Sequence, residues 1–465
     1  MALTAAAPPE PGPAPSARRP GRDPLVDLIR AAGIAAVLLL HWLMPVLAYG
    51  DGVLRFGNAL SGPGGWAVTW VAQVMPLVFF AGGAANAMSW AVHLRRGGGA
   101  AGWLSGRLLR LAGPVLPLAA VWTVLPHLLL ALGVPEQPVQ LGARIAGQLL
   151  WFLAVYVIAV ASAPLLLRLP ARWDGALLTG LAGCALAVDA ARFAGVPLVG
   201  YLNVVFVWVF VHQLGTLYAR GRLGGLAGRR AAAVSAAAFA LLAAVALPDG
   251  LYPASMIGMP GAPVSNMSPP TFCLILLACA HVAAVLALRP VLVRAAARPL
   301  VAGPVRFLSE RMMTVYLWHM PALCAVSAVA VVGLGAPTPA PGGALWWLGL
   351  PLWLAALGCV LAGLVRVFAR FERTAVRPGR SAPAAAAGLV LVGAGLLGLT
   401  AYGFVPADSL PGLLVSGPVP AVAAIAAGLA LAGRGGTQSS HFPISRSSTY
   451  RSSMTNSRTS SPSRR

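Results

Sequence analysis

The sequence contains no lysine and very little charge of any kind. Only 11 of its 465 residues are acidic, all 33 basic residues are arginine, and charged residues make up 9% of the chain. Hydrophobic residues account for 58%, and the mean hydropathy is +0.80. A soluble globular protein of this length carries far more charge, so the composition excludes that class and indicates a membrane protein.

Cysteine is scarce as well. The five cysteines all lie within apolar segments, and their spacing fits neither a zinc site nor a disulfide framework. We therefore interpret them as small packing residues, and we predict no metal site and no metal cofactor.

The formal net charge of +22 does not indicate a nucleic-acid partner, because the arginines are spread over the connections between apolar segments. This distribution is typical of the positive-inside rule, which orients membrane helices. We expect membrane lipid around the protein, and we place both termini in the cytoplasm of a multi-pass protein of the plasma membrane.

Apolar segments longer than about 18 residues, enough to cross a ~30 Å hydrocarbon layer as helix, recur along the chain. The sequence predicts an all-α fold, a polytopic transmembrane helical bundle of about 10 core spans plus 2 C-terminal spans. The expected spans are 27–49, 66–92, 107–133, 145–169, 176–196, 199–219, 229–248, 271–294, 308–333, 344–369, 384–404 and 412–433. We expect a disordered Pro/Ala-rich cytoplasmic N-terminus (1–24), a ten-helix membrane domain (25–370), two additional transmembrane helices (371–433) and a disordered Ser/Arg-rich tail (434–465).

Two polar residues interrupt the first apolar run. Arg30 and His41 are eleven positions apart, close to three whole helical turns, so their side chains leave one helix on the same face. The axial gap is about 16 Å at 1.5 Å per residue. Asp27 lies one turn before Arg30 and can pair with it. Ionisable groups inside a membrane are costly and mark a functional site by default.

A second pattern, Arg-x-x-Arg, stands at the start of the third span. Arg107 and Arg110 project from one helical face. Two guanidinium groups can hold phosphates in a bidentate manner. Arginines also belong at cytoplasmic helix ends for topological reasons alone, and the sequence does not separate these two interpretations.

The ninth span carries Tyr316 and His319 on one helical face, and Pro321 can free backbone groups near them. Other intramembrane histidines need no catalytic explanation, because a single histidine in a helical bundle more often makes an interhelical hydrogen bond. These histidines are His127, His212 and His281.

Four segments in this order resemble the membrane-bound acyltransferase-3 family: VDLIRAAGIAAVLLLHW, MPLVFFAGGAANAMSW, SGRLLRLAGPVLP and LSERMMTVYLWHMP. The spacing of Arg30 to His41 is similar to that family's signature of Arg, ten residues and His, and Arg107 and Arg110 are similar to its Arg-x-x-Arg. The likeness extends from about residue 25 to 370, the first ten spans. In the second span the family usually has Ser-Gly where this chain has Gly82-Gly83, so any role of that hydroxyl is absent here.

The resemblance implies a bacterial enzyme that transfers an acyl group, commonly acetyl, from cytoplasmic acyl-coenzyme A to a hydroxyl of a cell-envelope carbohydrate or a secondary metabolite. It implies His41 as general base or as relay for the acyl group. Imidazole suits a base, because removing a hydroxyl proton needs a group that titrates near neutral pH. Arg30 would share the catalytic site, and Arg30, Arg107 and Arg110 would bind the phosphates of coenzyme A. Further candidate site residues are Asp27, Tyr316 and His319.

The longest connection on the side opposite the termini, 249–270, is rich in Gly, Pro, Met and Ser. Long loops are commonly functional, which makes this segment a candidate lid or acceptor-side surface. A floppy exterior loop is the alternative.

A multi-span transporter or flippase for a polar or lipid-linked solute is the alternative function, since buried histidines and Pro-interrupted helices also suit alternating access. No internal repeat is evident, and acidic residues within the spans are few. A non-catalytic assembly or lipid-binding protein is a third alternative, but it leaves the polar stripe of the first helix unexplained. The identity of the acceptor, the acyl chain length and the oligomeric state stay open.

Overall fold

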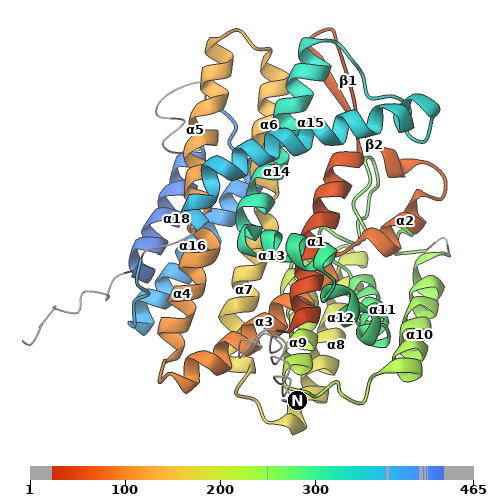
Figure 1. The fold of residues 1–465 in the computed structure, drawn as a ribbon, viewed down its shortest axis with the longest axis vertical. Helices are drawn as coiled ribbons and strands as arrows, with labels where there is room; N and C mark the ends of the chain where they lie inside the picture. Colours follow the sequence, from red (N-terminus) through yellow and green to blue (C-terminus); the bar gives the residue numbers. More distant parts are fainter. Residues whose placement is uncertain are drawn as a thin grey trace, which may run out of the picture.

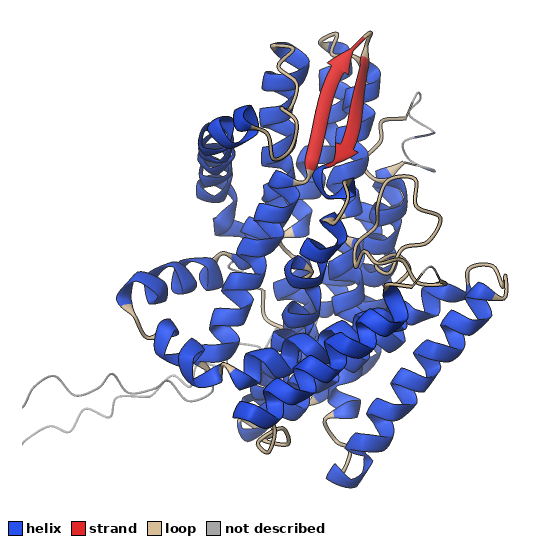
Figure 2. Ribbon diagram, turned by 90° about the vertical axis from the view of Figure 1, so that its right-hand side faces the viewer, coloured by secondary structure: helices blue, strands red, loops and turns tan. Residues whose placement is uncertain are grey.

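The computed structural model describes residues 23–248, 250–372, 376–407, 412, 415 and 417–433, and every structural statement below refers to these residues. The two segments predicted to be disordered lie outside them, except for Asp23 and Pro24. Most of the described chain is helical and its one sheet has two strands, as the predicted fold class requires (Figure 1, Figure 2).

Ten described helical segments are long and apolar enough to cross a membrane, and an eleventh results if two helices bent by 68° are counted as one. That pair, α11 (Phe272–Ala287) and α12 (Arg289–Ala296), replaces the continuous span predicted over 271–294. The helix at the predicted twelfth span, α18 (Pro418–Gly433), has 16 residues. At 1.5 Å per residue such a helix is about 24 Å long, short of a ~30 Å hydrocarbon layer.

The other elements follow the order of the apolar segments, with short 3-10 turns between some of them. They are α1 (Pro24–Leu43), β1 (Pro45–Gly50), β2 (Val53–Asn58), α2 (Gly65–Ala72), α3 (Met75–Arg95), α4 (Ala100–Ala112), α5 (Val115–Ala131), α6 (Glu136–Gln148), α7 (Trp151–Leu166), α8 (Asp174–Phe193), α9 (Asn203–Ala219), α10 (Gly228–Ala246), α13 (Pro299–Glu310), α14 (Met312–Ser327), the π-helical η4 (Ala328–Gly333), α15 (Ala344–Phe368) and α16 (Ala382–Tyr402).

The first span ends earlier than predicted. Helix α1 stops at Leu43, and the apolar residues that follow form the antiparallel hairpin β1–β2. Asp51 and Gly52 have φ of 52° and 77°, the positive values that a tight type I′ turn needs. An Asp-Gly pair between two short apolar runs is the sequence signal for this hairpin. The hairpin is attached to the bundle through Thr338, whose N–H donates to the Leu47 carbonyl (2.8 Å).

Helices α3 and α9 touch backbone to backbone. A Cβ atom on Gly83 would lie 1.9 Å from the carbonyl oxygen of His212, and one on Gly215 would lie 1.8 Å from the carbonyl oxygen of Phe80. Small residues permit this close approach, which is a common way for membrane helices to pack. The contact fixes the backbone of His212 against α3.

Helices α16 and α18 share the core of the preceding helices. A Cβ atom on Gly388 would lie 2.8 Å from the carbonyl oxygen of Gly428, so these two helices also approach closely. Phe404 is fully buried, and its N–H donates to the carbonyl of Ala143 on α6 (2.9 Å). Helix α16 therefore lies against α4, α6 and α7, and α18 lies against α4 and α5.

The connection before α11 folds over α2. The indole N–H of Trp70 donates to the carbonyl of Ala254 (2.7 Å). The N–H of Met256, whose side chain is fully buried, donates to Oγ1 of Thr69 (2.9 Å). Of the two alternatives for this connection, the packing favours a built surface over a floppy loop.

Candidate functional site

Helices α1 and α14 lie side by side and carry predicted site residues on their facing sides. As their spacing predicts, Arg30 and His41 both reach α14. Nη2 of Arg30 donates to the sulfur of Met312 (3.5 Å), and His41 bonds to His319. The pairing of Asp27 with Arg30 stays a prediction.

His41 and His319 form a hydrogen-bonded pair. Nδ1 of His319 lies 2.6 Å from the carbonyl oxygen of Tyr316, and because a carbonyl only accepts, this Nδ1 carries a proton. In neutral His319 the other nitrogen, Nε2, is then an acceptor, and it lies 3.1 Å from Nδ1 of His41. His41 therefore donates from Nδ1, and the lone pair of its neutral ring is on Nε2.

Contacts around the pair hold both rings in place. The indole N–H of Trp42 donates to the carbonyl of His319 (3.1 Å), and the indole N–H of Trp353 donates to the carbonyl of Trp42 (3.0 Å). The hydroxyl of Tyr316 donates to the carbonyl of Leu149. Tyr316, a predicted site residue, thus anchors α14 through its hydroxyl. The two tryptophans were missed by the sequence analysis, since no local spacing connects them to His319.

The N-terminus of α14 is held by Glu372. Its carboxylate accepts hydrogen bonds from the backbone N–H of Met313 (3.1 Å), the backbone N–H of Thr314 (3.2 Å) and the hydroxyl of Thr314 (2.7 Å). These N–H groups have no partner within the helix, and a negative charge is favourable at a helix N-terminus. Glu372 therefore sets the position of the helix that carries His319.

His41 lies on the wall of a large cavity, whereas its partner His319 is fully buried behind it. The cavity volume is about 1030 Å³. Its walls come from the end of α1, from α2, α6, α7, α14 and α16, and from the connection before α11. The β1–β2 hairpin, at the top of Figure 1, forms one side. The imidazole of His41 and a large cavity therefore meet at one place.

The predicted arginines gather away from this cavity. Arg107 lies on α4 with its guanidinium 5.3 Å from the centre of the Trp103 ring, and its Nη2 donates to the carbonyl of Ala85 (3.3 Å). Its charge interacts electrostatically with those of Arg30 and Arg110. Arg110 is exposed. The charges of Arg30 and Arg110 act on that of Arg107, and Arg30, Arg107 and Arg110 are not among the described residues that line the cavity.

A buried polar cluster lies beside Arg107. Nδ2 of Asn86 is 3.0 Å from Nε2 of His212 and 3.3 Å from the hydroxyl of Tyr156. Nδ1 of His212, Oδ1 of Asn86 and both polar atoms of Gln213 are buried without a hydrogen-bond partner among the described residues. Buried polar groups are normally paired, so this cluster is a second place where a polar ligand could bind. The bond between Asn86 on α3 and His212 on α9 is the interhelical hydrogen bond that we expected for His212. Asn86 and Gln213 were missed by the sequence analysis, although Asn86 is a polar break in an apolar run.

Aromatic rings connect this polar cluster to the histidine pair. The ring centres of Tyr156 and Phe152 are 5.7 Å apart, those of Phe152 and Tyr316 are 5.3 Å apart, and those of Tyr316 and His319 are 6.1 Å apart. A Cβ atom on Gly82 would lie 2.6 Å from the ring of Tyr156. The Tyr156 ring therefore fills the space beside Gly82, the position where the acyltransferase-3 family usually has serine.

Two of the remaining histidines have structural partners. Nε2 of His281 bonds to the carbonyl of Trp70 on α2 (2.8 Å), which is the interhelical hydrogen bond that we expected. Nδ1 of His127 bonds to the carbonyl of Thr123 within its own helix (3.1 Å). In the described part of the chain, no group of three or more His, Cys, Asp or Glu side chains could hold a metal ion.

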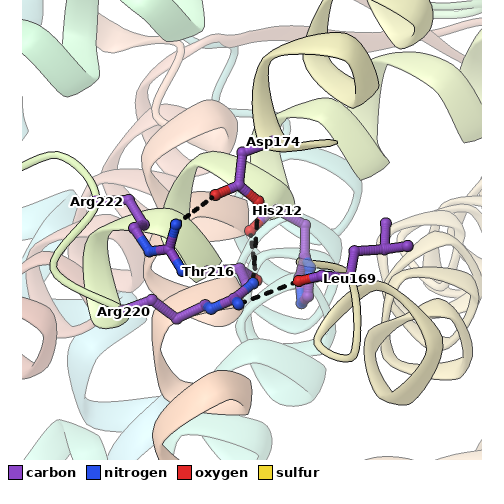
Figure 3. Close-up of polar contacts among 6 residues, drawn as sticks. All are labelled: Leu169, Asp174, His212, Thr216, Arg220 and Arg222. Atoms are coloured by element: carbon purple, nitrogen blue, oxygen red, sulfur yellow. Dashed lines mark hydrogen bonds and ion pairs between the residues drawn. The ribbon is translucent and has the colours of Figure 1, made fainter. Parts of the chain in front are cut away.

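Arginines at the ends of helices also pair locally. Asp174, at the start of α8, forms ion pairs with Arg222 (3.4 Å) and Arg220 (3.9 Å), and Arg220 also donates to the carbonyl of Leu169 (3.2 Å) (Figure 3). These contacts tie the end of α9 to the start of α8, so the two arginines have a structural role.

The fold and site together define a polytopic helical protein with a histidine pair at the wall of a large cavity. A family model described as an acyltransferase domain matches residues 23–363, which is most of the chain. The chain therefore belongs to the acyltransferase-3 family and is an acyltransferase of groups other than amino-acyl groups. Searches of curated proteins and of solved structures found no match. The matched region includes both histidines of the pair and the three arginines Arg30, Arg107 and Arg110.

Proposed function

We propose that this acyltransferase moves an acyl group, commonly acetyl, from acyl-coenzyme A to a hydroxyl of an acceptor, with His41 as the general base. The acceptor would be an envelope carbohydrate or a secondary metabolite. The observation that carries this proposal is the His41–His319 pair at the wall of the cavity. Of the two rings, only that of His41 lies on the cavity wall.

The transfer needs one proton acceptor and one proton donor. Nε2 of His41 takes the proton of the acceptor hydroxyl while the hydroxyl oxygen attacks the thioester carbonyl. The tetrahedral intermediate then collapses, the carbon–sulfur bond breaks, and the proton returns from His41 to the coenzyme A sulfur. The products are an ester and free coenzyme A. His319 accepts from Nδ1 of His41 throughout, which keeps the ring oriented and stabilises the imidazolium that forms.

The donor enters from the side of the arginines in this proposal. Coenzyme A is polyanionic, and guanidinium groups bind phosphates in a bidentate manner. The mutual proximity of Arg30, Arg107 and Arg110 supports a phosphate-binding role. The arginine-rich connections also support a cytoplasmic donor side, with both termini in the cytoplasm of the plasma membrane.

The test is thiol release from acetyl-coenzyme A by the purified protein, with envelope extract as acceptor. His41→Ala should abolish release while thermal unfolding and membrane insertion stay as in the unmodified protein. The matched control is His127→Ala, which removes a histidine of α5 that bonds only within its own helix and should leave the rate unchanged. Full activity of His41→Ala would refute the role of His41. Solute uptake into vesicles, with no thiol release from any donor, would favour a transporter.

A relay in which His41 itself carries the acyl group is distinguished by trapping. Incubation with radiolabelled acetyl-coenzyme A in the absence of acceptor should leave the protein unlabelled if His41 acts as a base. Label that depends on His41 would indicate the relay.

A further inference from the structure

The size of the cavity exceeds what the reacting groups need. Pockets for drug-sized ligands span about 300–1,000 Å³, and this cavity has about 1030 Å³. An acetyl group and the end of a pantetheine arm occupy a small part of such a volume. The remainder is available to the molecule that presents the hydroxyl.

The walls of the cavity carry no charged side chain, and their only histidine among the described residues is His41. No Asp, Glu, Arg or Lys occurs among the described residues that line it. Apolar side chains come from every surrounding element. Examples are Leu54 and Phe56 of the hairpin, Ile257 and Met267 of the connection before α11, and Leu141 and Ile145 of α6.

Several polar groups on the walls already have partners within the protein. The Gln73 amide donates to the carbonyl of Met256 (3.2 Å) and accepts from the N–H of Met75 (3.2 Å). The hydroxyl of Thr400 donates to the carbonyl of Leu396 (2.8 Å). The hydroxyl of Tyr316 is likewise bonded, as described above. These groups add little hydrogen-bonding capacity for a ligand.

The hydrogen-bonding groups left for a substrate are a minority of the residues that line the cavity. Ser327 lines the cavity, and its hydroxyl is buried without a partner among the described residues. Ser327, the imidazole of His41 and the side chains of Gln148, Tyr201 and Ser268 are polar positions on a wall that is otherwise mostly apolar. A sugar would bring several hydroxyls into this space, and each one left unpaired carries the full cost of its desolvation.

We propose that the cavity binds an apolar, drug-sized alcohol that presents one hydroxyl to His41, in preference to a carbohydrate. This inference rests on the proposed function, because the hydroxyl is the group that receives the acyl chain. It selects the hydrophobic secondary-metabolite class of acceptor. The skeleton of the alcohol lies against the hairpin, α6 and the connection before α11.

Binding and transfer are tested with three cyclic alcohols and the full-length protein in nanodiscs. The probes are cyclododecanol, cyclohexanol with the same hydroxyl on a smaller ring, and myo-inositol with a hydroxyl on every ring carbon. Each buried methylene adds a factor of about four to an affinity, so cyclododecanol should exceed cyclohexanol in kcat/KM by at least about tenfold. Myo-inositol should give no transfer above the rate without acceptor.

A matched pair of cysteine variants tests whether cyclododecanol binds in the cavity. Cys324 lines it, whereas Cys359 is exposed on α15. Cys324→Trp should abolish saturable binding of radiolabelled cyclododecanol, and Cys359→Trp should not. Cys324→Phe is the milder variant if the tryptophan prevents folding.

The outcomes separate this inference from the proposed function. Transfer to myo-inositol that depends on His41, without transfer to cyclododecanol, would keep the acyltransferase mechanism and overturn the inference. Absence of saturable cyclododecanol binding would overturn it even if no acceptor were turned over. A preference for dodecanoyl-coenzyme A that Cys324→Trp removes, with no preference among the alcohols, would assign the cavity to the acyl chain and also overturn it. Saturable binding without any transfer would support the cavity assignment and contradict the proposed function.

Discussion

Nδ1 of His41 donates a hydrogen bond to Nε2 of His319 across the interface of α1 and α14, over 3.1 Å. The direction of this bond follows from the other nitrogen of His319, because its Nδ1 must donate to the carbonyl of Tyr316. The Tyr316 carbonyl on α14 thus places a proton on Nδ1 of His319. With both rings neutral, this arrangement leaves the lone pair of His41 on its Nε2. The register between the two helices therefore sets this hydrogen bond.

Replacing His319 should lower turnover without weakening donor binding. His319→Ala removes the acceptor for Nδ1 of His41, and we expect kcat to fall about 100-fold, the size of a typical general-base contribution. The KM for acetyl-coenzyme A should stay within about twofold, because His319 is fully buried and does not line the cavity.

The conservative variant His319→Gln distinguishes positioning from a purely structural role. The glutamine side-chain oxygen can accept from Nδ1 of His41, so kcat of His319→Gln should be about tenfold higher than that of His319→Ala. Steady-state kinetics of both variants make the comparison. An increase in KM at unchanged kcat would place His319 in donor binding and contradict this assignment.

Local spacing predicted one half of this site. Arg30 and His41 share a helix, so their common face follows from the helical period, and both side chains indeed reach α14. The partner of His41 is 278 positions away in the chain, and only tertiary packing brings the two rings together. The same limit applies to Glu372, which caps a helix that begins 60 residues earlier.

The hairpin was missed for a different reason. Residues 45–49 are apolar and continue the pattern of the first span, so hydropathy alone favours a longer helix. The deciding signal is short and local, the Asp51-Gly52 turn, and it lies just beyond the predicted span. This hairpin forms part of the cavity wall, so the substrate space was not predictable from hydropathy.

Reversing a charge in the Arg-x-x-Arg pattern should weaken the use of the acyl donor. Arg110→Glu replaces an exposed guanidinium that interacts with Arg107, and we expect the KM for acetyl-coenzyme A to rise about tenfold or more, with a smaller change in kcat. The effect should shrink at high salt, because exposed charges are screened.

The matched control for this charge reversal is Arg144→Glu, at an exposed arginine on α6. Kinetics at low and high ionic strength compare the two variants. An equal rise in KM for both would indicate a general charge effect in place of a phosphate site.

Adding one methyl group between α3 and α9 should destabilise the protein. In Gly215→Ala the new Cβ would lie 1.8 Å from the carbonyl oxygen of Phe80, so the helices must move apart. Overpacking of this kind costs about 1–3 kcal/mol and sometimes more. Gly183→Ala on α8 is the control, since a Cβ there meets open space. Thermal unfolding in detergent should show a lower midpoint for Gly215→Ala alone. An unchanged midpoint would show that α9 can shift without cost.

Removing the carboxylate at the N-terminus of α14 should reach the active site through the helix. Glu372→Ala leaves the N–H groups of Met313 and Thr314 and one hydroxyl without their acceptor, which should cost about 1–3 kcal/mol of stability. Glu372→Gln keeps an acceptor oxygen without the charge and should lose less. Glu310→Ala is the control, because that side chain is 56% exposed and pairs only with its neighbour Arg311, an arrangement worth little.

Because α14 carries His319, Glu372→Ala should also lower kcat more than it raises the KM for the donor. Loss of stability with kcat intact would show that the other contacts of α14 are sufficient to position His319.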